Sequence, residues 1–286
     1  MVDQATIETL MDKAWPAIER EDLECDSTVK WVLRASEGVT QRANSVWPMA
    51  PAFTAAADSD VRLTRSVRTA SEWYRRRRLP LIFQVFDDSR SAALNGVLDR
   101  QRFTRQSETK IMVRGRDGVP ANLPGPDVEL SDVPSAEWLS VWWSVDGRGG
   151  DPELSVAQKI LSGCPAAYAL VRDDAPGAPP RGRPAAAGGG RDPAGVPAAG
   201  GRLALVDGWG GIYSMATSVE HRRKGYGTRV LNGLLEAGAQ RGLEGFWLLV
   251  TAANHGAQGL YAQAGFTEHG SYLYRQAPLK RSVSGC

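Results

Sequence analysis

The sequence predicts an α/β fold with a mixed sheet, divided between two similar units that follow one another along the chain. Short apolar segments of strand length alternate with longer segments whose apolar residues recur at helical spacing. A stretch rich in glycine and proline separates two parts of comparable length near residue 120. The order helix, apolar strand, helix, Phe-Thr occurs in both parts, and the two Phe-Thr pairs begin at Phe103 and Phe266, an offset of 266 − 103 = 163.

The composition is that of a globular protein without a strong charge bias. The chain has 286 residues, of which 42% are hydrophobic, so it can bury the cores of two ordinary domains. Its 34 basic and 32 acidic residues give a net charge of +2, which argues against a general nucleic-acid binder. No apolar run reaches the roughly 18–20 residues of a membrane helix, and the acidic, amphipathic start does not resemble a signal peptide. We therefore expect a soluble protein with no membrane and no nucleic-acid partner.

The three cysteines, Cys25, Cys164 and Cys286, lie far apart and have no metal-binding spacing. They predict neither a disulfide framework nor a zinc site, and we expect no metal. A reducing, cytoplasmic location fits this pattern best.

The first part, residues 1–118, is expected to form one unit. Apolar residues at helical spacing from Ile7 to Ile18 predict an opening helix. Two extended segments on either side of Glu37 and Gly38 predict a hairpin. The expected elements are, in order, a helix over 6–20, strands over 28–33 and 43–47, a helix over 61–78, a strand over 81–86, a helix over 89–97 and a strand over 103–113.

Four consecutive arginines, Arg75 to Arg78, end the second helix of this part. They permit a phosphate-binding or nucleic-acid-binding hypothesis. We favour the simpler interpretation, in which a solvated helix end carries positive charges that complement the C-terminal dipole.

The second unit is expected over residues 128–286, after a linker at 119–127. Residues 176–201 consist almost entirely of Gly, Pro, Ala and Arg, and this low-complexity insertion is expected to be disordered because it cannot bury enough apolar surface to offset ordering entropy. It is either a tolerated surface insertion or a locally frame-shifted reading of the gene. The expected elements are a strand over 128–130, helices over 135–143 and 151–161, strands over 167–172, 203–206 and 211–217, a helix over 228–241, a strand over 246–250, a helix over 257–264 and a strand over 271–274.

The stretch Met215–Thr228 has the layout of an anion-binding loop. An extended apolar segment runs into basic residues and two glycines, Gly225 and Gly227, and a long amphipathic helix follows. Glycine permits positive φ and close approach of a ligand, and the first N–H groups of a helix favour phosphate. The alternative is an ordinary basic turn between a strand and a helix.

Two segments of the second part resemble a known family. Residues 222–227, Arg-Arg-Lys-Gly-Tyr-Gly, resemble the Arg/Gln-x-x-Gly-x-Gly/Ala signature of the GCN5-related N-acetyltransferases, the GNAT superfamily. Residues 254–266 are similar to the Asn-(x)6-Tyr-(x)3-Gly-Phe segment of the same family, at the right separation. The resemblance covers about 128–276 and implies the GNAT fold, here as two tandem GNAT-like domains of which the first is degenerate.

The resemblance implies an acetyl-CoA-dependent N-acetyltransferase, in which a primary amine of a small molecule or protein attacks the thioester directly. Tyr261 corresponds to a family tyrosine that protonates or hydrogen-bonds the departing sulfur, although a tyrosine packed in the core is the alternative. Asn254 resembles a polar contact to the cofactor, and it is also suited to cap the helix that follows. By the same resemblance, acetyl-CoA is held by Met215, Thr217, Arg222, Arg223, Lys224, Gly225, Tyr226, Gly227, Thr228 and Asn254.

No general base and no acceptor can be assigned from the sequence. The titratable residues close to the loop in sequence are each more often exposed polar residues than bases, and they are Asp207, Glu220, His221 and His255. Three tryptophans, Trp138, Trp142 and Trp143, fall in the region that borders the acceptor pocket in relatives, and core packing is the alternative for them. The oligomeric state is also left open.

The first part lacks the residues that this chemistry needs. No Arg-x-x-Gly-x-Gly precedes its second helix, and Leu98 occupies the place of Tyr261. We expect this unit to be catalytically silent and to serve as a packing partner or as a wall of the substrate site. The main rival to the enzyme is a non-catalytic acyl-CoA-binding sensor, against which the presence of Tyr261 argues.

Overall fold

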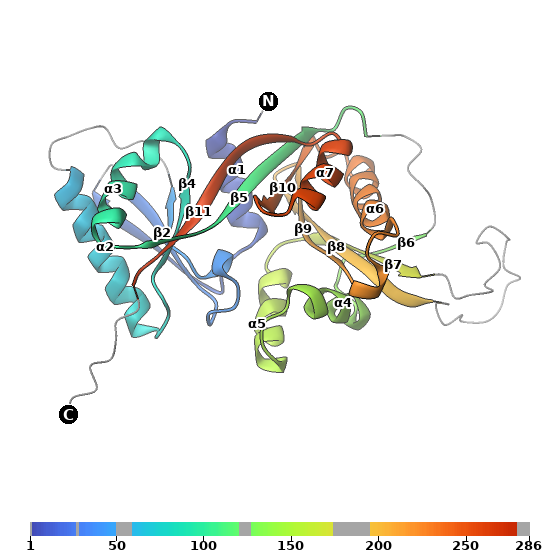
Figure 1. Ribbon diagram of the computed structural model, residues 1–286, viewed down its shortest axis with the longest axis horizontal. Coiled ribbons are helices and arrows are strands. Elements are labelled where there is room, and N and C mark those ends of the chain that lie inside the picture. Colours follow the sequence, from blue (N-terminus) through green and yellow to red (C-terminus); the bar gives the residue numbers. More distant parts are fainter. Residues whose placement is uncertain (1, 27–28, 50–58, 120–126, 174–194, 279–286) are drawn as a thin grey trace, which may run out of the picture.

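Two long strands, β5 (Thr104–Gly115) and β11 (Thr267–Gln276), connect the two halves of the molecule. The computed structural model describes residues 2–26, 29–49, 59–119, 127–173 and 195–278. In Figure 1, β5 and β11 run side by side across the centre, with the first half of the chain on the left and most of the second half on the right.

An eight-stranded mixed sheet runs through both halves. Its strand order is β4-β11-β5-β10-β9-β8-β7-β6, in which β9 and β10 are parallel and the other neighbours are antiparallel. The predicted mixed sheet is therefore confirmed. Its remaining strands are β4 (Ile82–Phe86), β6 (Val128–Ser131), β7 (Ala166–Asp173), β8 (Val196–Val206), β9 (Trp209–Thr217) and β10 (Gly245–Thr251).

A second, three-stranded antiparallel sheet, in the order β1-β2-β3, lies in the first half. The predicted pairing is confirmed, because Lys30 of β2 lies opposite Met49 of β3. The second strand begins at Trp47 and not at Ala43, which lies in a short 3-10 helix. Two other details of the prediction are also wrong. The opening helix ends at Ala14 because Pro16 follows, and the segment after it is a strand that the charged sequence did not suggest. The strands are β1 (Glu19–Asp26), β2 (Val29–Ala35) and β3 (Trp47–Met49), and the short helix η1 (Gln41–Ala43) precedes β3.

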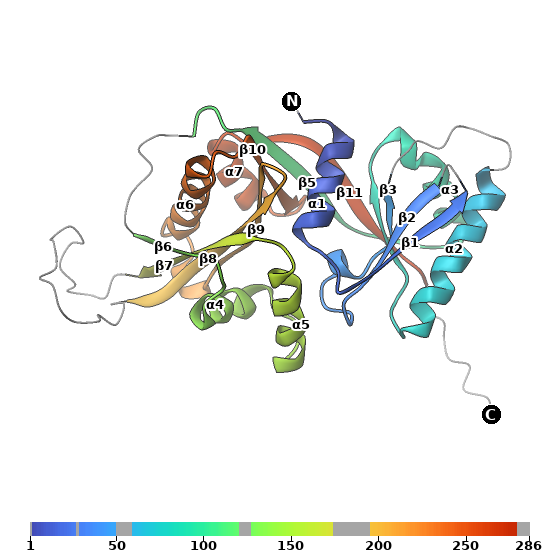
Figure 2. The ribbon, with the colours of Figure 1, turned by 180° about the vertical axis from the view of Figure 1, so that it is seen from behind.

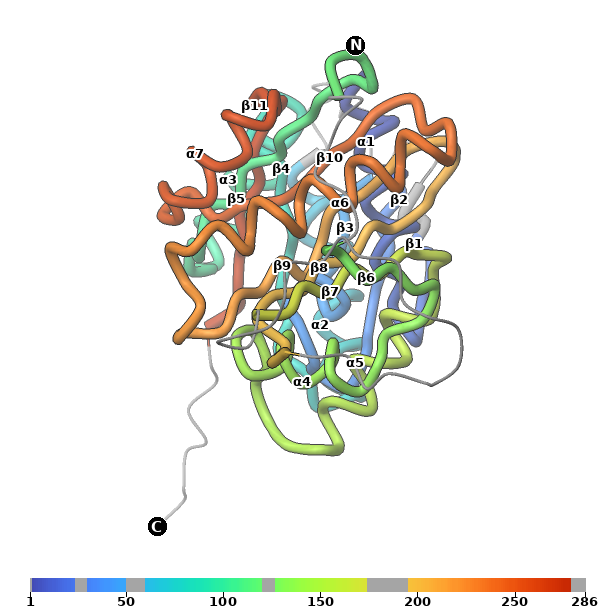
Figure 3. Tube along the Cα trace, turned by 90° about the vertical axis from the view of Figure 1, so that its right-hand side faces the viewer, coloured from blue at the N-terminus to red at the C-terminus, as the bar shows by residue number. Residues whose placement is uncertain are grey.

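Helices cover both faces of the large sheet. In Figure 3, α6 (Tyr226–Gln240) and α7 (His255–Gln263) lie on one side, and α4 (Ala136–Asp146) and α5 (Asp151–Ser162) lie on the other. No helix within the described ranges is both long and apolar enough to cross a membrane. In the first half the helices are α1 (Gln4–Ala14), α2 (Ser59–Arg76) and α3 (Ala92–Arg100), and single 3-10 turns are η2 (Ser89–Ser91) and η3 (Val219–His221).

The tandem arrangement is visible as a repeated order of elements. The series α2, β4, α3, β5 recurs as α6, β10, α7, β11, and the two last strands start 267 − 104 = 163 positions apart. The two units exchange these last strands: β11 lies between β4 and β5, and β5 lies between β10 and β11. Figure 2 shows the exchanged pair from behind, with α1 in front of it. The boundary predicted at 119–127 stays a prediction, and residues 120–126 lie outside the described ranges.

The insertion predicted to be disordered, residues 176–201, includes residues that form a strand. Residues 174–194 lie outside the described ranges, but the segment from Val196 to Gly201 is the first half of β8 and pairs with β7. Its small residues are required by packing. A Cβ on Gly200 would lie 3.0 Å from Nε1 of Trp138, and one on Gly201 would lie 2.6 Å from Sδ of Met215.

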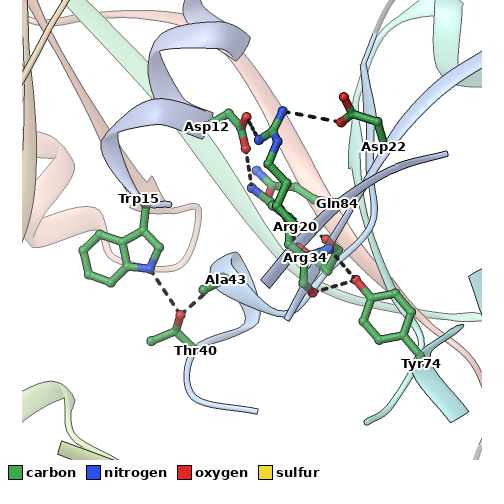
Figure 4. A network of polar contacts seen from close by, with 10 residues as sticks. Asp12, Trp15, Arg20, Asp22, Arg34, Thr40, Ala43, Tyr74 and Gln84 are labelled. Atoms are coloured by element: carbon green, nitrogen blue, oxygen red, sulfur yellow. Dashed lines mark hydrogen bonds and ion pairs between the residues drawn. The ribbon is translucent and has the colours of Figure 1, made fainter. Parts of the chain in front are cut away.

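A buried polar network anchors α1 to the sheet of the first unit (Figure 4). Arg34 on β2 is fully buried, and it faces Asp12 of α1 with 3.5 Å between Nη1 and Oδ1. Its Nη2 also donates to the side chains of Ser45 (2.9 Å) and Gln84 (3.0 Å). Because a buried charge is tolerated only when it is paired and hydrogen-bonded, this network fixes α1, and with it the following Trp15.

Candidate active site

The two central parallel strands separate halfway along their length. The pairing of β9 with β10 runs from Trp209 opposite Gly245 to Ile212 opposite Leu248. Both strands continue beyond that point without pairing to each other. A bulge explains the divergence. Ser214 adopts a φ of +54°, and the register of β9 against β8 shifts there, so that β9 bends. The far part of β9, which carries the predicted contact residues Met215 and Thr217, therefore faces away from β10.

The glycine loop ends in an N-terminus of α6 that no side chain caps. Gly225 is the N-cap residue, with a φ of +84°, and a Cβ placed on it would meet no atom within 4 Å. The first helical hydrogen bond of α6 runs from the N–H of Arg229 to the carbonyl of Gly225 (3.1 Å). The N–H groups of the first turn thus point forward, and the side chains of Arg222, Arg223 and Lys224 in front of them are exposed. This arrangement suits an anion.

β9, α6 and α7 meet at Gly227. A Cβ on Gly227 would lie 3.7 Å from Oγ1 of Thr217 on β9 and 3.8 Å from Cδ2 of Leu260 on α7. The structure thus brings together the three predicted parts of the site, namely the bent strand, the glycine loop and the helix of Tyr261.

A row of hydrogen bonds holds the loop against β7. Ser218 Oγ lies 2.6 Å from Nδ1 of His221, and Nε2 of His221 lies 3.1 Å from Oδ2 of Asp173. The hydroxyl of Tyr226 donates to the other oxygen of Asp173, and this bond is the largest cause of the lowered pKa of that carboxyl group. The Tyr226 ring is buried. Its side chain therefore anchors the loop, and His221, a candidate base from the sequence, is engaged in the same anchor.

Tyr261 combines a buried ring with an accessible hydroxyl. The ring is 6% exposed and packs against Phe266, with centroids 6.2 Å apart. Its hydroxyl has no hydrogen-bond partner among the described residues. It is also not fully buried, so solvent can reach it. Burial, with a contribution from the charge of Asp146, raises the pKa of Tyr261 to about 12. The phenol is consequently protonated at neutral pH.

Several other predicted residues are engaged elsewhere. Asn254 caps α7, because its side chain accepts a hydrogen bond from the N–H of Ala257 (3.1 Å). Trp138 and Trp142 belong to the core, and Trp143 is half-buried. Asp207 forms an exposed ion pair with Lys13 (2.7 Å).

One acidic residue that no sequence motif marks, Asp146, acts electrostatically on Tyr261. Asp146, the last residue of α4, is accessible to solvent, but the protein around its carboxyl group raises its pKa, an effect opposed by Trp142, Arg42 and Arg148. Its charge acts on Tyr261 as well. Asp146 lies 115 positions before Tyr261 (261 − 146 = 115), so no local pattern could have joined the two.

A mixed sheet whose central parallel pair separates beside a glycine loop at a helix N-terminus defines the GCN5-related N-acetyltransferase fold. Solved structures agree. A GCN5-related N-acetyltransferase from Kribbella flavida matches with a TM-score of 0.66 and 17% identity, over 99% of this chain and 98% of that chain. A tandem GNAT protein from the clavulanic acid biosynthesis pathway matches with a TM-score of 0.63 and 12% identity, over 96% of this chain and 88% of that one.

Sequence comparison identifies the family. The family model described as "Probable histone acetyltransferase Rv0428c C-terminal" matches residues 4–275, so the chain belongs to this acetyltransferase family. The "Uncharacterized N-acetyltransferase YobR" of Bacillus subtilis (strain 168) is 28% identical over 284 residues, which cover 96% of this chain and 99% of that protein.

Proposed function

We propose that the protein is an acetyl-CoA-dependent N-acetyltransferase that acts on a primary amine of a small molecule or a protein. The separation of β9 from β10 beside the uncapped N-terminus of α6 carries this proposal. It brings the backbone donors of the first turn of α6 close to the bent part of β9 and to α7, the helix that carries Tyr261. A protein amine as acceptor is in line with the description of the family model.

The residues present fit acetyl-CoA. The space in front of Gly225 and the N–H groups from Lys224 to Thr228 suit a pyrophosphate. The exposed Arg222 and Arg223 add positive charge. The bent part of β9, with Met215 and Thr217, would hold the pantetheine arm, and Asn254 at the start of α7 would contribute a polar contact besides its cap.

Two side chains are suited to move protons. When bound, acetyl-CoA supplies the acetyl group as a thioester, whose C–S bond breaks as the new N–C bond forms. Tyr261 holds a proton on Oη, where it can be given to a departing sulfur. Asp146, which acts electrostatically on Tyr261, is our candidate to accept the proton of the attacking amine. Positioning of the two reactants contributes further to the rate.

The described contacts weaken the alternatives. The hydrogen-bonded row of Ser218, His221 and Asp173 resembles the catalytic triad of a hydrolase. However, Ser218 Oγ donates a hydrogen bond to the carbonyl of Ala198 (3.2 Å), and the row holds the glycine loop in place. In the arginine run, Arg77 pairs with Glu19 (2.8 Å), as expected of a solvated helix end.

The first unit is proposed to be catalytically silent. Leu98 lies in α3 at the position that corresponds to Tyr261 in α7, and it is fully buried. It offers no proton donor.

The test is release of thiol from acetyl-CoA with a panel of amines and peptides, for wild type and Tyr261→Phe. Loss of the phenol should lower kcat about 100-fold, the lower range for general acids, with the Kd for acetyl-CoA unchanged. Tyr74→Phe is the matched control, because Tyr74 is a buried tyrosine of the first unit whose hydroxyl donates to the carbonyl of Arg34. Cofactor binding without thiol release from any acceptor would favour the non-catalytic sensor.

A further inference from the structure

Arg42 of the first unit reaches β9 of the second unit. It lies in η1, and its guanidinium stands over the ring of Trp15 at 5.2 Å and over that of Tyr213 at 5.3 Å. Tyr213 belongs to β9, one residue before the bulge at Ser214. A cation from the silent unit is thus placed beside the strand that lines the proposed active site.

The loop that carries Arg42 is held in one conformation. Thr40 has a φ of +65°, and its Oγ1 accepts hydrogen bonds from the N–H of Ala43 and from Nε1 of Trp15, both at 3.3 Å (Figure 4). The side chain of Asn44 donates to the carbonyls of Val39 (2.7 Å) and Thr40 (2.8 Å). Such fixation lowers the entropy cost of binding a ligand.

Arg42 is a charged donor without an acidic partner. None of the described carboxylates forms an ion pair with it, and its Nε is buried without an acceptor. Among the nitrogens of its guanidinium, only Nε is both fully buried and unpaired, and the residue as a whole is half-buried. The guanidinium of Arg42 keeps its charge at neutral pH, because arginine is not deprotonated in proteins. A planar guanidinium of this kind matches a carboxylate.

The charge of Asp146, our candidate base, interacts with Arg42 and with Tyr261, and Asp146 forms a close ion pair with neither. Because the guanidinium of Arg42 stands over Tyr213 of β9, the strand of the proposed site, it could receive a carboxylate next to the attacking amine.

We propose that Arg42 binds the carboxylate of the acceptor, and that the acceptor is a small amine of the amino-acid type. This proposal rests on the proposed acetyltransferase function and narrows its substrate class. It also gives the silent unit a role, because the unit supplies one wall of the acceptor site and the cation in it.

The experiment compares matched pairs of acceptors: histidine with histamine, phenylalanine with phenethylamine, and tryptophan with tryptamine. For the productive pair, kcat/KM of wild type should be about 10- to 100-fold higher for the amino acid, the range of a charge-assisted hydrogen bond. Arg42→Gln should bring this ratio close to one, and Arg42→Lys, which keeps the charge, should restore part of it. Arg77→Gln is the control. The guanidinium of Arg77 also stacks on a tryptophan, with its Cζ 3.5 Å from the ring centroid of Trp73, but Arg77 lies in the turn after α2, away from β9.

Calorimetric titration of the same compounds into protein saturated with coenzyme A tests binding without turnover. Wild type should bind the amino acid and Arg42→Gln should lose at least about tenfold in affinity. If amines are acetylated with no preference for the carboxylate, or only lysine peptides are acetylated, the proposal is overturned while the acetyltransferase function stands. If acetyl transfer itself fails, calorimetry still decides whether Arg42 recognises a carboxylate.

Discussion

At the scale of single residues, the pKa shifts of Tyr261 and Asp146 suit the acid and base roles that we propose for them. The pKa of Tyr261 is about 12, so its proton is retained at neutral pH. Burial raises the pKa of Asp146, which makes this carboxylate a better proton acceptor than an ordinary one.

The pH dependence should reveal Asp146. Because the carboxylate form is the active one, kcat/KM should fall as the pH falls through the pKa of Asp146, which lies above the ordinary value of 3.8. Asp146→Asn should lower kcat/KM by about 100-fold, the lower range for general bases, and should remove this acidic limb. The measurement is the pH profile of thiol release with the neutral-amine concentration corrected at each pH.

Asp207→Asn provides the comparison for this experiment. Asp207 is also near the site in sequence, but it forms an exposed ion pair with Lys13. Its variant should keep the wild-type profile. An acidic limb that survives in Asp146→Asn would assign the base to another group.

At the scale of elements, α6 has a left-handed glycine near each end, and only one of them faces the site. Gly225 (φ +84°) precedes the helix and Gly242 (φ +75°) follows it, and a Cβ on either would meet no atom within 4 Å. Valine at either position costs backbone strain of about 1–2 kcal/mol. The two substitutions should therefore lower the thermal stability by similar amounts.

Only Gly225→Val should impair the cofactor site. Its side chain would project in front of the first turn of α6, where we propose that the pyrophosphate binds. The Kd for acetyl-CoA, measured by calorimetry, should rise at least about tenfold, equivalent to 1.4 kcal/mol, whereas Gly242→Val should bind normally. Equal affinities of the two variants would place the cofactor elsewhere.

Local patterns in the sequence predicted most elements of the second unit and the glycine loop, because helical spacing, glycines and a short motif are all contained in a few neighbouring residues. Composition misled at Val196–Gly201, where glycines and alanines are needed for close packing inside a sheet. The strand Glu19–Asp26 was missed because its charged residues lack the apolar alternation of a buried strand.

The parts of the proposed site that the sequence could not predict depend on tertiary contacts. Asp146 and Arg42 are separated by 146 − 42 = 104 positions, and neither belongs to a recognisable motif. The family resemblance predicts that Tyr226 contacts the cofactor, but it gave no sign that the hydroxyl of this residue donates a hydrogen bond to Asp173 of a distant strand. Only the three-dimensional arrangement of the sheet reveals these partners.

At the scale of the whole molecule, the exchange of strands makes the two units interdependent. Strand β5 of the first unit pairs with β10 from Gly115 to Thr109, and it also separates β10 from β11. A fragment of residues 127–286 would lack this central strand and would expose apolar surface that β5 and α1 cover.

Residues 127–286 expressed alone should therefore show no cooperative thermal unfolding and no binding of acetyl-CoA. Coexpression with residues 1–119 should restore both, because the two pieces together supply every strand of the sheet. Circular dichroism and calorimetry provide the readouts. A fragment 127–286 that unfolds cooperatively by itself would show that β5 is dispensable for the second unit.

The exchange also determines the timing of folding during synthesis. Strand β11 fills the place between β4 and β5 in the first unit, and it is made after every other described element. Until β11 emerges from the ribosome, the half that was translated first has a gap in the middle of its sheet, and its unpaired strand edges need protection from aggregation. The first unit can therefore complete its sheet only after β11, the last described strand, has been synthesised.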